Sequence, residues 1–186
     1  MRIIAGEARG RQISAPRGQH TRPTLDRVRE NIFNMIQNDV PGSIVLDLFA
    51  GSGALSLEAL SRGASRAVMV DSDRNACKVQ TENTSALGYS GKVKQYQADW
   101  RTAVSDLRKE KAVFDLVFLD PPYIYTDMRE VFSALVPLVR PDSLLVLEHQ
   151  AGTGILVPDI FVSVKQRSWG FCAASFYRLL CKEESH

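Results

Sequence analysis

A short apolar segment of the chain ends in an acid, two prolines and an aromatic ring. Residues 114–119 are apolar except for one aspartate, and Asp120, Pro121, Pro122 and Tyr123 follow them. This pattern predicts a strand buried on both faces of a parallel sheet, and ligands of such sheets bind beyond the carboxyl ends of the strands. The prolines fix the backbone and donate no hydrogen bond. The candidate catalytic residues are therefore Asp120 and Pro121, whose carboxylate and carbonyl can accept the two N–H groups of an exocyclic amine, and Tyr123, on which a planar base can stack.

A second motif upstream favours this chemical role over a purely structural turn. A buried strand ends near Asp47 and runs into a turn that contains Phe49, Gly51 and Gly53, followed by a helix. Glycines let the backbone approach a ligand closely and leave the helix N-terminus open, so these residues are candidate cofactor contacts. Ser56 stands where a dinucleotide fingerprint needs its third glycine, which disfavours a dehydrogenase. Asp47 suits a cationic ligand better than a pyrophosphate.

Two more acids follow predicted strand ends. Asp71 lies 20 positions after Gly51, where an acid can accept hydrogen bonds from both ribose hydroxyls, whereas Asp73 is placed to cap the next helix. Asp99 follows the third strand and can accept from an adenine amino group, with Trp100 near the ring. Any one such acid is more commonly a cap or a surface residue. Acids at three successive strand ends, however, describe a nucleoside that carries positive charge and no phosphate, which is S-adenosylmethionine.

Alternating apolar strands and helices must position these residues. We predict strands over 43–47, 66–70, 93–97, 114–119, 143–148, 161–167 and 175–180, and helices over 54–62, from 73 to about 86 and over 127–136. Strands that alternate with helices indicate an α/β fold with a parallel sheet. The connection between the last two strands is too short for a helical crossover, so these strands are predicted to form an antiparallel hairpin at the sheet edge.

The N-terminal segment is strongly basic. Residues 1–29 carry a local charge of +5 within a total of +2, from two acids and from seven arginines, Arg2, Arg9, Arg11, Arg17, Arg22, Arg27 and Arg29. The segment has no aromatic residue and cannot form a core of its own, so it is expected to lie across the domain surface or to stay mobile. Arginine without lysine favours contact with RNA phosphates over a merely solvated tail, because the guanidinium matches phosphate oxygens.

A helix is predicted to dock this arm on the main domain. Thr24 can cap it, apolar positions recur with helical spacing, and Pro41 follows it. Arg27 and Arg29 are expected to lie off its buried face, available to a ligand. We therefore predict an arm with its docking helix over residues 1–40 and a catalytic domain over 41–186.

The composition is that of an ordinary globular protein, with 45% hydrophobic and 24% charged residues. No apolar run reaches the roughly 18 residues that cross a bilayer, so we expect no membrane association and a cytoplasmic location. Cys77, Cys172 and Cys181 show no paired spacing, which argues against disulfides and against a zinc site. The three histidines are scattered, and no metal is expected.

The chain resembles a known family at these motifs. DLFAGSG at 47–53, followed by DPPY at 120–123, resembles the Rossmann-like class I methyltransferases that modify exocyclic amines of bases. RPTLDRVRE at 22–30, together with ALSLEALSRGA at 54–64, is similar to the bacterial RsmD family. The resemblance covers essentially the whole chain. It implies a seven-stranded, mostly parallel sheet with an antiparallel C-terminal strand, and methylation of N2 of one guanine in small-subunit ribosomal RNA from S-adenosylmethionine.

By position, the resemblance also implies roles for individual residues. Cofactor contacts are implied for Asp47, Gly51, Gly53, Asp71 and Asp99, and base contacts for Asp120 and Tyr123. Two alternatives stay open. An adenine-N6 DNA methyltransferase would use the same acid–proline motif, although only about 40 residues remain here for the separate recognition domain that such enzymes usually need. A non-catalytic RNA-binding assembly factor would need no acids at strand ends. The chain is expected to act as a monomer on free or assembled ribosomal RNA.

Overall fold

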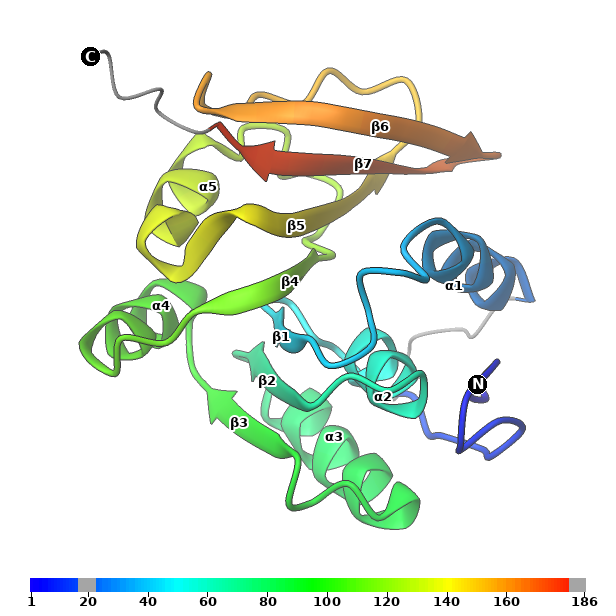
Figure 1. The fold of residues 1–186 in the computed structure, drawn as a ribbon. Helices are drawn as coiled ribbons and strands as arrows, with labels where there is room; N and C mark the ends of the chain where they lie inside the picture. Colours follow the sequence, from blue (N-terminus) through cyan, green and yellow to red (C-terminus); the bar gives the residue numbers. More distant parts are fainter. Residues whose placement is uncertain (17–22, 181–186) are drawn as a thin grey trace.

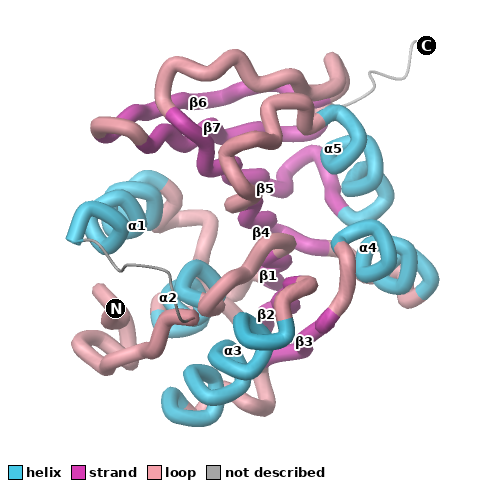
Figure 2. Tube along the Cα trace, turned by 180° about the vertical axis from the view of Figure 1, so that it is seen from behind, coloured by secondary structure: helices cyan, strands magenta, loops and turns pink. Residues whose placement is uncertain are grey.

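The computed structural model describes residues 1–16 and 23–180, which form a sheet with helices on both faces (Figures 1 and 2). The seven strands of this described part are β1 (Ile44–Asp47), β2 (Arg66–Asp71), β3 (Val93–Gln97), β4 (Phe114–Leu119), β5 (Val139–Gln150), β6 (Phe161–Trp169) and β7 (Cys172–Leu179). Their order in the sheet is β3-β2-β1-β4-β5-β7-β6. Strands β1 to β5 run parallel, and β7 is antiparallel to both of its neighbours. The predicted Rossmann-like topology is confirmed.

Helices cover both faces of this sheet. They are α1 (Pro23–Met35), α2 (Ala54–Ser61), α3 (Arg74–Leu87), α4 (Trp100–Lys109) and α5 (Arg129–Leu135), with a 3-10 turn η1 (Val136–Leu138) after α5. Figure 1 shows α1, α2 and α3 on one face and α4 and α5 on the other, and the reverse view in Figure 2 agrees. Among the described helices, none is both long and apolar enough to span a membrane.

Strand β4 lies in the middle of the sheet and is buried on both faces, as predicted. Leu116 and Phe118 belong to the core beneath α1 and α2, and the ring of Phe118 packs 5.5 Å from that of Phe33 in α1. Val117 and Leu119 belong to the second core, beneath α4 and α5. Successive side chains of β4 point into these two apolar cores in turn, which explains why nearly all residues of the segment are apolar.

Several predicted boundaries shift. Strand β5 extends beyond the predicted 143–148 in both directions, and α5 is shorter than the predicted 127–136. The antiparallel hairpin of β6 and β7 is confirmed, with β7 inserted next to β5. The predicted N-cap at Thr24 is wrong, because the helix begins one residue earlier. Pro23 occupies its first position, where a proline loses no helical hydrogen bond and already has a helical φ.

The described part of the arm, residues 1–16, lies across the domain beside α2 (Figure 1). Ile3 and Ile13 are buried in the same core as α1 and α2. The carboxylate of Glu58 in α2 accepts the backbone N–H groups of Ile4 (2.8 Å) and Ala5 (3.1 Å). Of the two states expected for the arm, docking on the domain is the one seen here. The division at residue 40 stays a prediction, although the two parts share a core.

The parallel register places acidic residues together at one edge of the sheet. Leu119 of β4 pairs with Leu147 of β5, so Asp120, just after β4, and Glu148, within β5, lie at the same level. Strand β4 lies between β5 and β1, and β1 ends at Asp47. This carboxyl edge is where ligands of open parallel sheets bind.

Candidate active site

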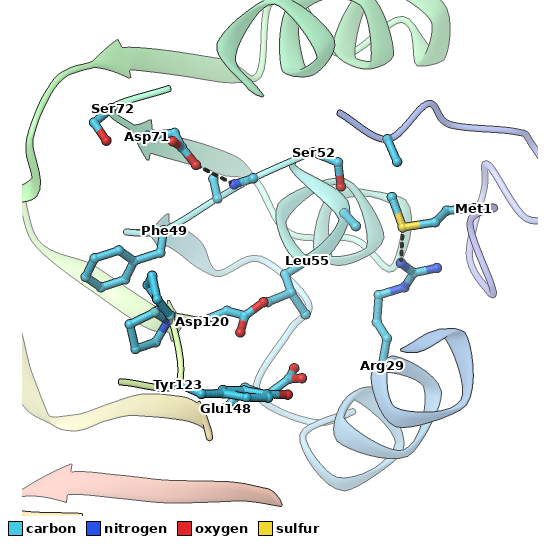
Figure 3. A pocket seen from close by; sticks show the side chains of 16 residues that line it. Met1, Arg29, Phe49, Ser52, Leu55, Asp71, Ser72, Asp120, Tyr123 and Glu148 are labelled. Carbon is cyan, nitrogen blue, oxygen red and sulfur yellow. Dashed lines mark hydrogen bonds between the residues drawn. The ribbon is translucent and has the colours of Figure 1, made fainter. Parts of the chain in front are cut away.

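A cavity of about 610 Å³ opens at the carboxyl edge of the sheet (Figure 3), a size typical of small-molecule sites. Side chains of Asp71 and Ser72 lie on one side of it, and those of Asp120, Tyr123 and Glu148 lie on the other. We call the first group, together with Gly51, the β2 side, and the second group the β4 side. The rest of the lining is Met1, Ala15, Arg29, Phe49, Ala50, Ser52, Ala54, Leu55, Pro121 and Pro122.

The β2 side is organised by backbone hydrogen bonds. The carboxylate of Asp71 accepts the N–H of Gly51 (2.8 Å) on one oxygen and the N–H of Asp73 (2.9 Å) on the other. The backbone of Gly51 has φ +53°, and its carbonyl accepts from Gln80 Nε2 at 3.0 Å. Each carboxylate oxygen has two lone pairs, so Asp71 is held in place and can still accept from the two hydroxyls of a ribose. Asp73 caps α3, which confirms the interpretation given to it.

Asp47 lies behind the cavity lining, at the end of β1. It is 1% exposed, and its Oδ2 accepts from the hydroxyl (2.9 Å) and the N–H (3.3 Å) of Ser56. The other oxygen, Oδ1, is buried and has no partner among the described residues. Burial, and then the neighbouring charge of Asp120, raise the pKa of Asp47 to about 7. Asp47 does not line the cavity, but its unpaired buried carboxylate oxygen fits a positively charged ligand such as S-adenosylmethionine, and its contact with the cofactor stays a prediction.

Three further predicted cofactor residues lie outside the cavity lining. Gly53 (φ +78°) is the N-cap of α2, where a Cβ would come within 3.0 Å of Met69 Sδ, and its contact with the cofactor stays a prediction. Trp100, predicted to lie near the adenine ring, is instead buried in the core with its face under the guanidinium of Arg101. Asp99 caps α4 by accepting the N–H of Arg101 at 2.9 Å. Its predicted contact with adenine stays a prediction.

Two aromatic rings stand at the cavity wall. Phe49 lines the cavity, and the centre of its ring lies 6.3 Å from that of Tyr125. Tyr123 remains 44% exposed, and its hydroxyl lies 3.2 Å from the buried thiol of Cys172 at the start of β7. Desolvation, followed by that contact, raises the pKa of Tyr123. The carbonyl of Pro122 accepts the N–H of Tyr125 (2.9 Å), so a turn fixes the backbone after Asp120.

The β4 side holds a pair of carboxylates without donors. Figure 3 shows Asp120 and Glu148 at the cavity, and among the described residues neither side chain accepts a hydrogen bond. Asp120 is reachable from the cavity, but the surrounding protein limits its solvation and raises its pKa to about 6. Desolvation, and then the charge of Asp120, raise the pKa of Glu148 to about 8. A ligand that brings hydrogen-bond donors to this side would be stabilised.

The prediction that Arg29 is exposed is wrong. It is 5% exposed, and Nη2 donates to the carbonyl of Arg2 (2.5 Å) and to Asp26 Oδ1 (3.1 Å). Because α1 turns this face toward α2, Arg29 also lies 3.9 Å from Glu58, and desolvation lowers its pKa. Arg29 nevertheless lines the cavity, opposite Asp120 in Figure 3. Arg27 is exposed, as predicted.

The other arginines proposed to bind RNA differ in their surroundings. Arg2 and Arg9 are exposed on the docked arm. Arg11 is exposed too, but its guanidinium donates to two backbone carbonyls at the C-terminal end of α3, a structural role that was not predicted. Arg17 and Arg22 lie outside the described residues. RNA binding by these side chains stays a prediction.

Glu148 is the site residue that the sequence reasoning missed. The strand 143–148 was predicted to end on this acid, and the rule applied to the other strand ends would have selected it. The positions of Met1 and Arg29 at the cavity depend on how the arm and α1 dock, which no local pattern indicates. Cys77 and Cys172 are buried free thiols, and Cys181 lies outside the described residues.

Comparison with known proteins identifies the family. The family model "Conserved hypothetical protein 95" matches residues 1–178. The chain is 34% identical to "Putative rRNA methyltransferase YlbH" of Bacillus subtilis, over 96% of this chain and 98% of the relative. It is 32% identical to "Ribosomal RNA small subunit methyltransferase D" of Escherichia coli, over 100% and 93%. A solved structure, "Putative methyltransferase yhhF from Escherichia coli", superposes with a TM-score of 0.83 at 30% identity, over 98% and 99% of the two chains. The protein therefore belongs to this family, the RsmD family that its motifs resemble.

Proposed function

We propose that the protein transfers a methyl group from S-adenosylmethionine to the exocyclic N2 amine of a guanine in small-subunit ribosomal RNA. Methylation of ribosomal RNA is supported by the family, whose members above are named as ribosomal RNA methyltransferases. The observation that carries the choice of an amine-bearing base is the donor-free carboxylate pair, Asp120 and Glu148, beside the ring of Tyr123.

The β2 side fits the nucleoside part of S-adenosylmethionine. When bound, this cofactor supplies a methyl group on a positively charged sulfur. Asp71 would hold the ribose hydroxyls, since its carboxylate is already fixed by two backbone N–H groups. Phe49 offers an apolar face at the same end of the cavity. The charge of Asp47 behind the lining favours a cation in front of it.

The β4 side would orient the target amine. The lone pair of a guanine amine is delocalised into the ring, so the amine is a poor nucleophile. Asp120 can accept one of its N–H groups, and we assign the second acceptor to the carbonyl of Pro121, because that of Pro122 already accepts from Tyr125. Acceptors on both hydrogens turn the lone pair toward the methyl donor and stabilise the positive charge that develops on nitrogen. At pH 7 a pKa of about 6 leaves Asp120 mostly ionised, as an acceptor.

RNA would be held outside this cavity. A base that is modified inside a pocket must leave its stack, and Tyr123, which remains partly exposed at the wall, can replace some of the lost stacking. Arg2 and Arg9 lie exposed on the docked arm, where they can contact phosphates. We further propose that the protein acts as a monomer in the cytoplasm, on RNA that is either free or assembled into the small subunit.

The test is methyl transfer from labelled S-adenosylmethionine to three substrates offered in parallel: free ribosomal RNA, assembled small subunits and genomic DNA. The products are digested to nucleosides and separated. We expect label in N2-methylguanosine from the RNA or the subunits, and the better substrate identifies the assembly state.

Label in N6-methyladenine from DNA would replace the proposal with the adenine-N6 alternative. Binding of RNA without transfer to any substrate would favour an assembly factor. Because an RNA already methylated in the cell would hide activity, the RNA and subunits are taken from cells that lack the endogenous family member.

A further inference from the structure

We propose that Glu148 reads the N1–H of the target guanine and thereby selects guanine against bases whose N1 is an acceptor. This inference rests on the proposed function, because it presupposes a base at the β4 side. It assigns a specificity role to a residue that lies in the cavity but has no part in the transfer described above.

Geometry places Glu148 next to the proposed amine acceptor. Leu147 pairs with Leu119 in the parallel register, so Glu148, inside β5, is level with Asp120, which directly follows β4. Both line the cavity, and Figure 3 shows Glu148 beside Tyr123. On the Watson–Crick edge of guanine the N1–H donor is next to the N2 amine. Two neighbouring carboxylates therefore match two neighbouring donors on one stacked base.

Glu148 is not committed to a structural interaction. Within the described residues it accepts no hydrogen bond and forms no salt bridge, although Arg29 lies close enough for its charge to lower the pKa of Glu148. The nearby Arg29 is held by Asp26 and by the backbone of Arg2 instead. A half-buried acid that faces a cavity without a donor is destabilised until a ligand supplies one.

The pairing is selective because bases differ at N1. Adenine and 2-aminopurine present an acceptor at this position, and an ionised carboxylate would face its lone pair. Sites that hydrogen-bond a substrate N–H discriminate strongly against analogues that lack it, since the buried acceptor is then left unpaired. Adenine also carries its amine at a different carbon, whereas 2-aminopurine keeps the N2 amine. 2-Aminopurine therefore isolates the contact at N1 and O6 from the reacting group.

The experiment compares guanine and 2-aminopurine at the target position of otherwise identical RNA, in whichever form, free or reconstituted, the guanine substrate is methylated. The ratio of kcat/KM for the two bases is measured at pH 8.5, above the pKa of about 8, so that Glu148 is ionised. We expect the unmodified enzyme to prefer guanine about 10- to 100-fold, and Glu148→Ala to bring the ratio close to one.

Two further variants make the outcome specific. Glu148→Gln keeps the size of the side chain and can turn its amide toward an acceptor at N1, so its ratio should fall below that of the unmodified enzyme. Glu110→Ala removes an exposed acid that pairs with Lys94, outside the cavity, and should leave the ratio unchanged. Thermal unfolding of each variant shows that it is folded.

The two proposals fail in different ways. An unmodified enzyme that methylates no guanine overturns the proposed function. An unmodified enzyme that methylates guanine, with a preference over 2-aminopurine that survives in Glu148→Ala, overturns only the role of Glu148 and assigns the discrimination to a residue that reads O6. A preference lost in Glu148→Ala and kept in Glu110→Ala supports the inference.

Discussion

Two groups of acids in this protein have opposite surroundings. Glu58 in α2 is fully buried, and both of its carboxylate oxygens are supplied with donors. It accepts the backbone N–H groups of Ile4 and Ala5 and the Nε–H of Arg62 (2.7 Å), and Arg29 lies nearby. These contacts join the arm and α1 to α2, so this acid is part of the scaffold.

At the carboxyl edge of the sheet the donors are missing. Asp120 and Glu148 face the cavity without a hydrogen bond from any described residue, and Asp47 has one unpaired buried oxygen. The pKa values of all three are raised, chiefly by desolvation. A carboxylate with little access to water therefore occurs in both groups, with donors in one and without them in the other. The supply of donors distinguishes the two groups, because an unsatisfied acid persists where a ligand completes it.

The largest effect should come from removing the central acceptor of the cavity. In Asp120→Ala the target amine loses a partner that is needed most when positive charge develops, so we expect transfer to fall by about 100- to 1,000-fold or more. The measurement is single-turnover methyl transfer at saturating RNA and cofactor. Asp115→Ala, on the same strand outside the cavity, is the matched control and should keep nearly full activity. Transfer by Asp120→Ala at the rate of that control would refute the proposed mechanism.

Changing the scaffold acid should have the next largest effect, on stability instead of chemistry. Glu58→Gln turns an amide donor toward N–H groups, removes a negative charge beside buried Arg29 and leaves half-buried Arg62 without its carboxylate partner, so the free energy of unfolding should fall by about 3 kcal/mol. Urea unfolding measures this. Activity per folded molecule should remain within a few-fold of the unmodified protein. A loss of activity in fully folded Glu58→Gln would mean that the two groups of acids are not separate.

The pH dependence of stability should carry the signature of the cavity acids. Their folded-state pKa values, about 6 for Asp120 and about 8 for Glu148, lie above those of the unfolded chain. At a pH between its unfolded-state and folded-state pKa, each of these groups keeps its proton in the folded protein and has lost it in the unfolded chain. Rising pH through this range therefore favours unfolding. The free energy of unfolding of the unmodified protein should therefore drop from pH 5 to pH 8 by more than that of the double variant Asp120→Asn, Glu148→Gln. An equal or larger drop in the double variant would contradict the raised pKa values.

The smallest effect is expected from the exposed arm. Arg2→Gln with Arg9→Gln should weaken RNA binding and reduce the slope of log affinity against log salt by about one for each phosphate that is no longer neutralised. Lys109→Gln, at the far end of α4 and paired with Asp106, serves as the control. If the double arginine variant and Lys109→Gln both keep the salt dependence of the unmodified protein, the arm contributes to the structure and not to RNA binding. Arg11 is left unchanged in this test because it also holds the end of α3.

Much of the fold was predictable because it follows from sequence patterns within single segments. The apolar run of β4 and the glycine turn after β1 are local patterns, and the parallel topology makes strand ends converge wherever the strands lie in sequence. Asp71, Gly51 and Asp120 could thus be assigned to one site from the sequence. The positions of these three residues depend on strands and turns that local sequence patterns define.

The predictions that failed depended on packing between distant segments. Arg29 was expected to be exposed from its place on a helix, but α1 turns that face toward Glu58, 29 residues further along the chain. Trp100 was assigned to the cavity because it follows a strand-end acid, yet a helix begins there and directs the ring into the core. Glu148 was not selected, although the predicted strand 143–148 also ends on an acid.

The most direct test of the contrast is the affinity of Asp120→Ala for S-adenosylmethionine, measured by isothermal titration calorimetry beside the unmodified protein. If the donor-free acids of the β4 side serve the base and the β2 side serves the cofactor, the dissociation constant should stay within a few-fold even though transfer is lost. A loss of cofactor affinity as large as the loss of transfer would contradict this division of the cavity and would assign Asp120 to the cofactor site.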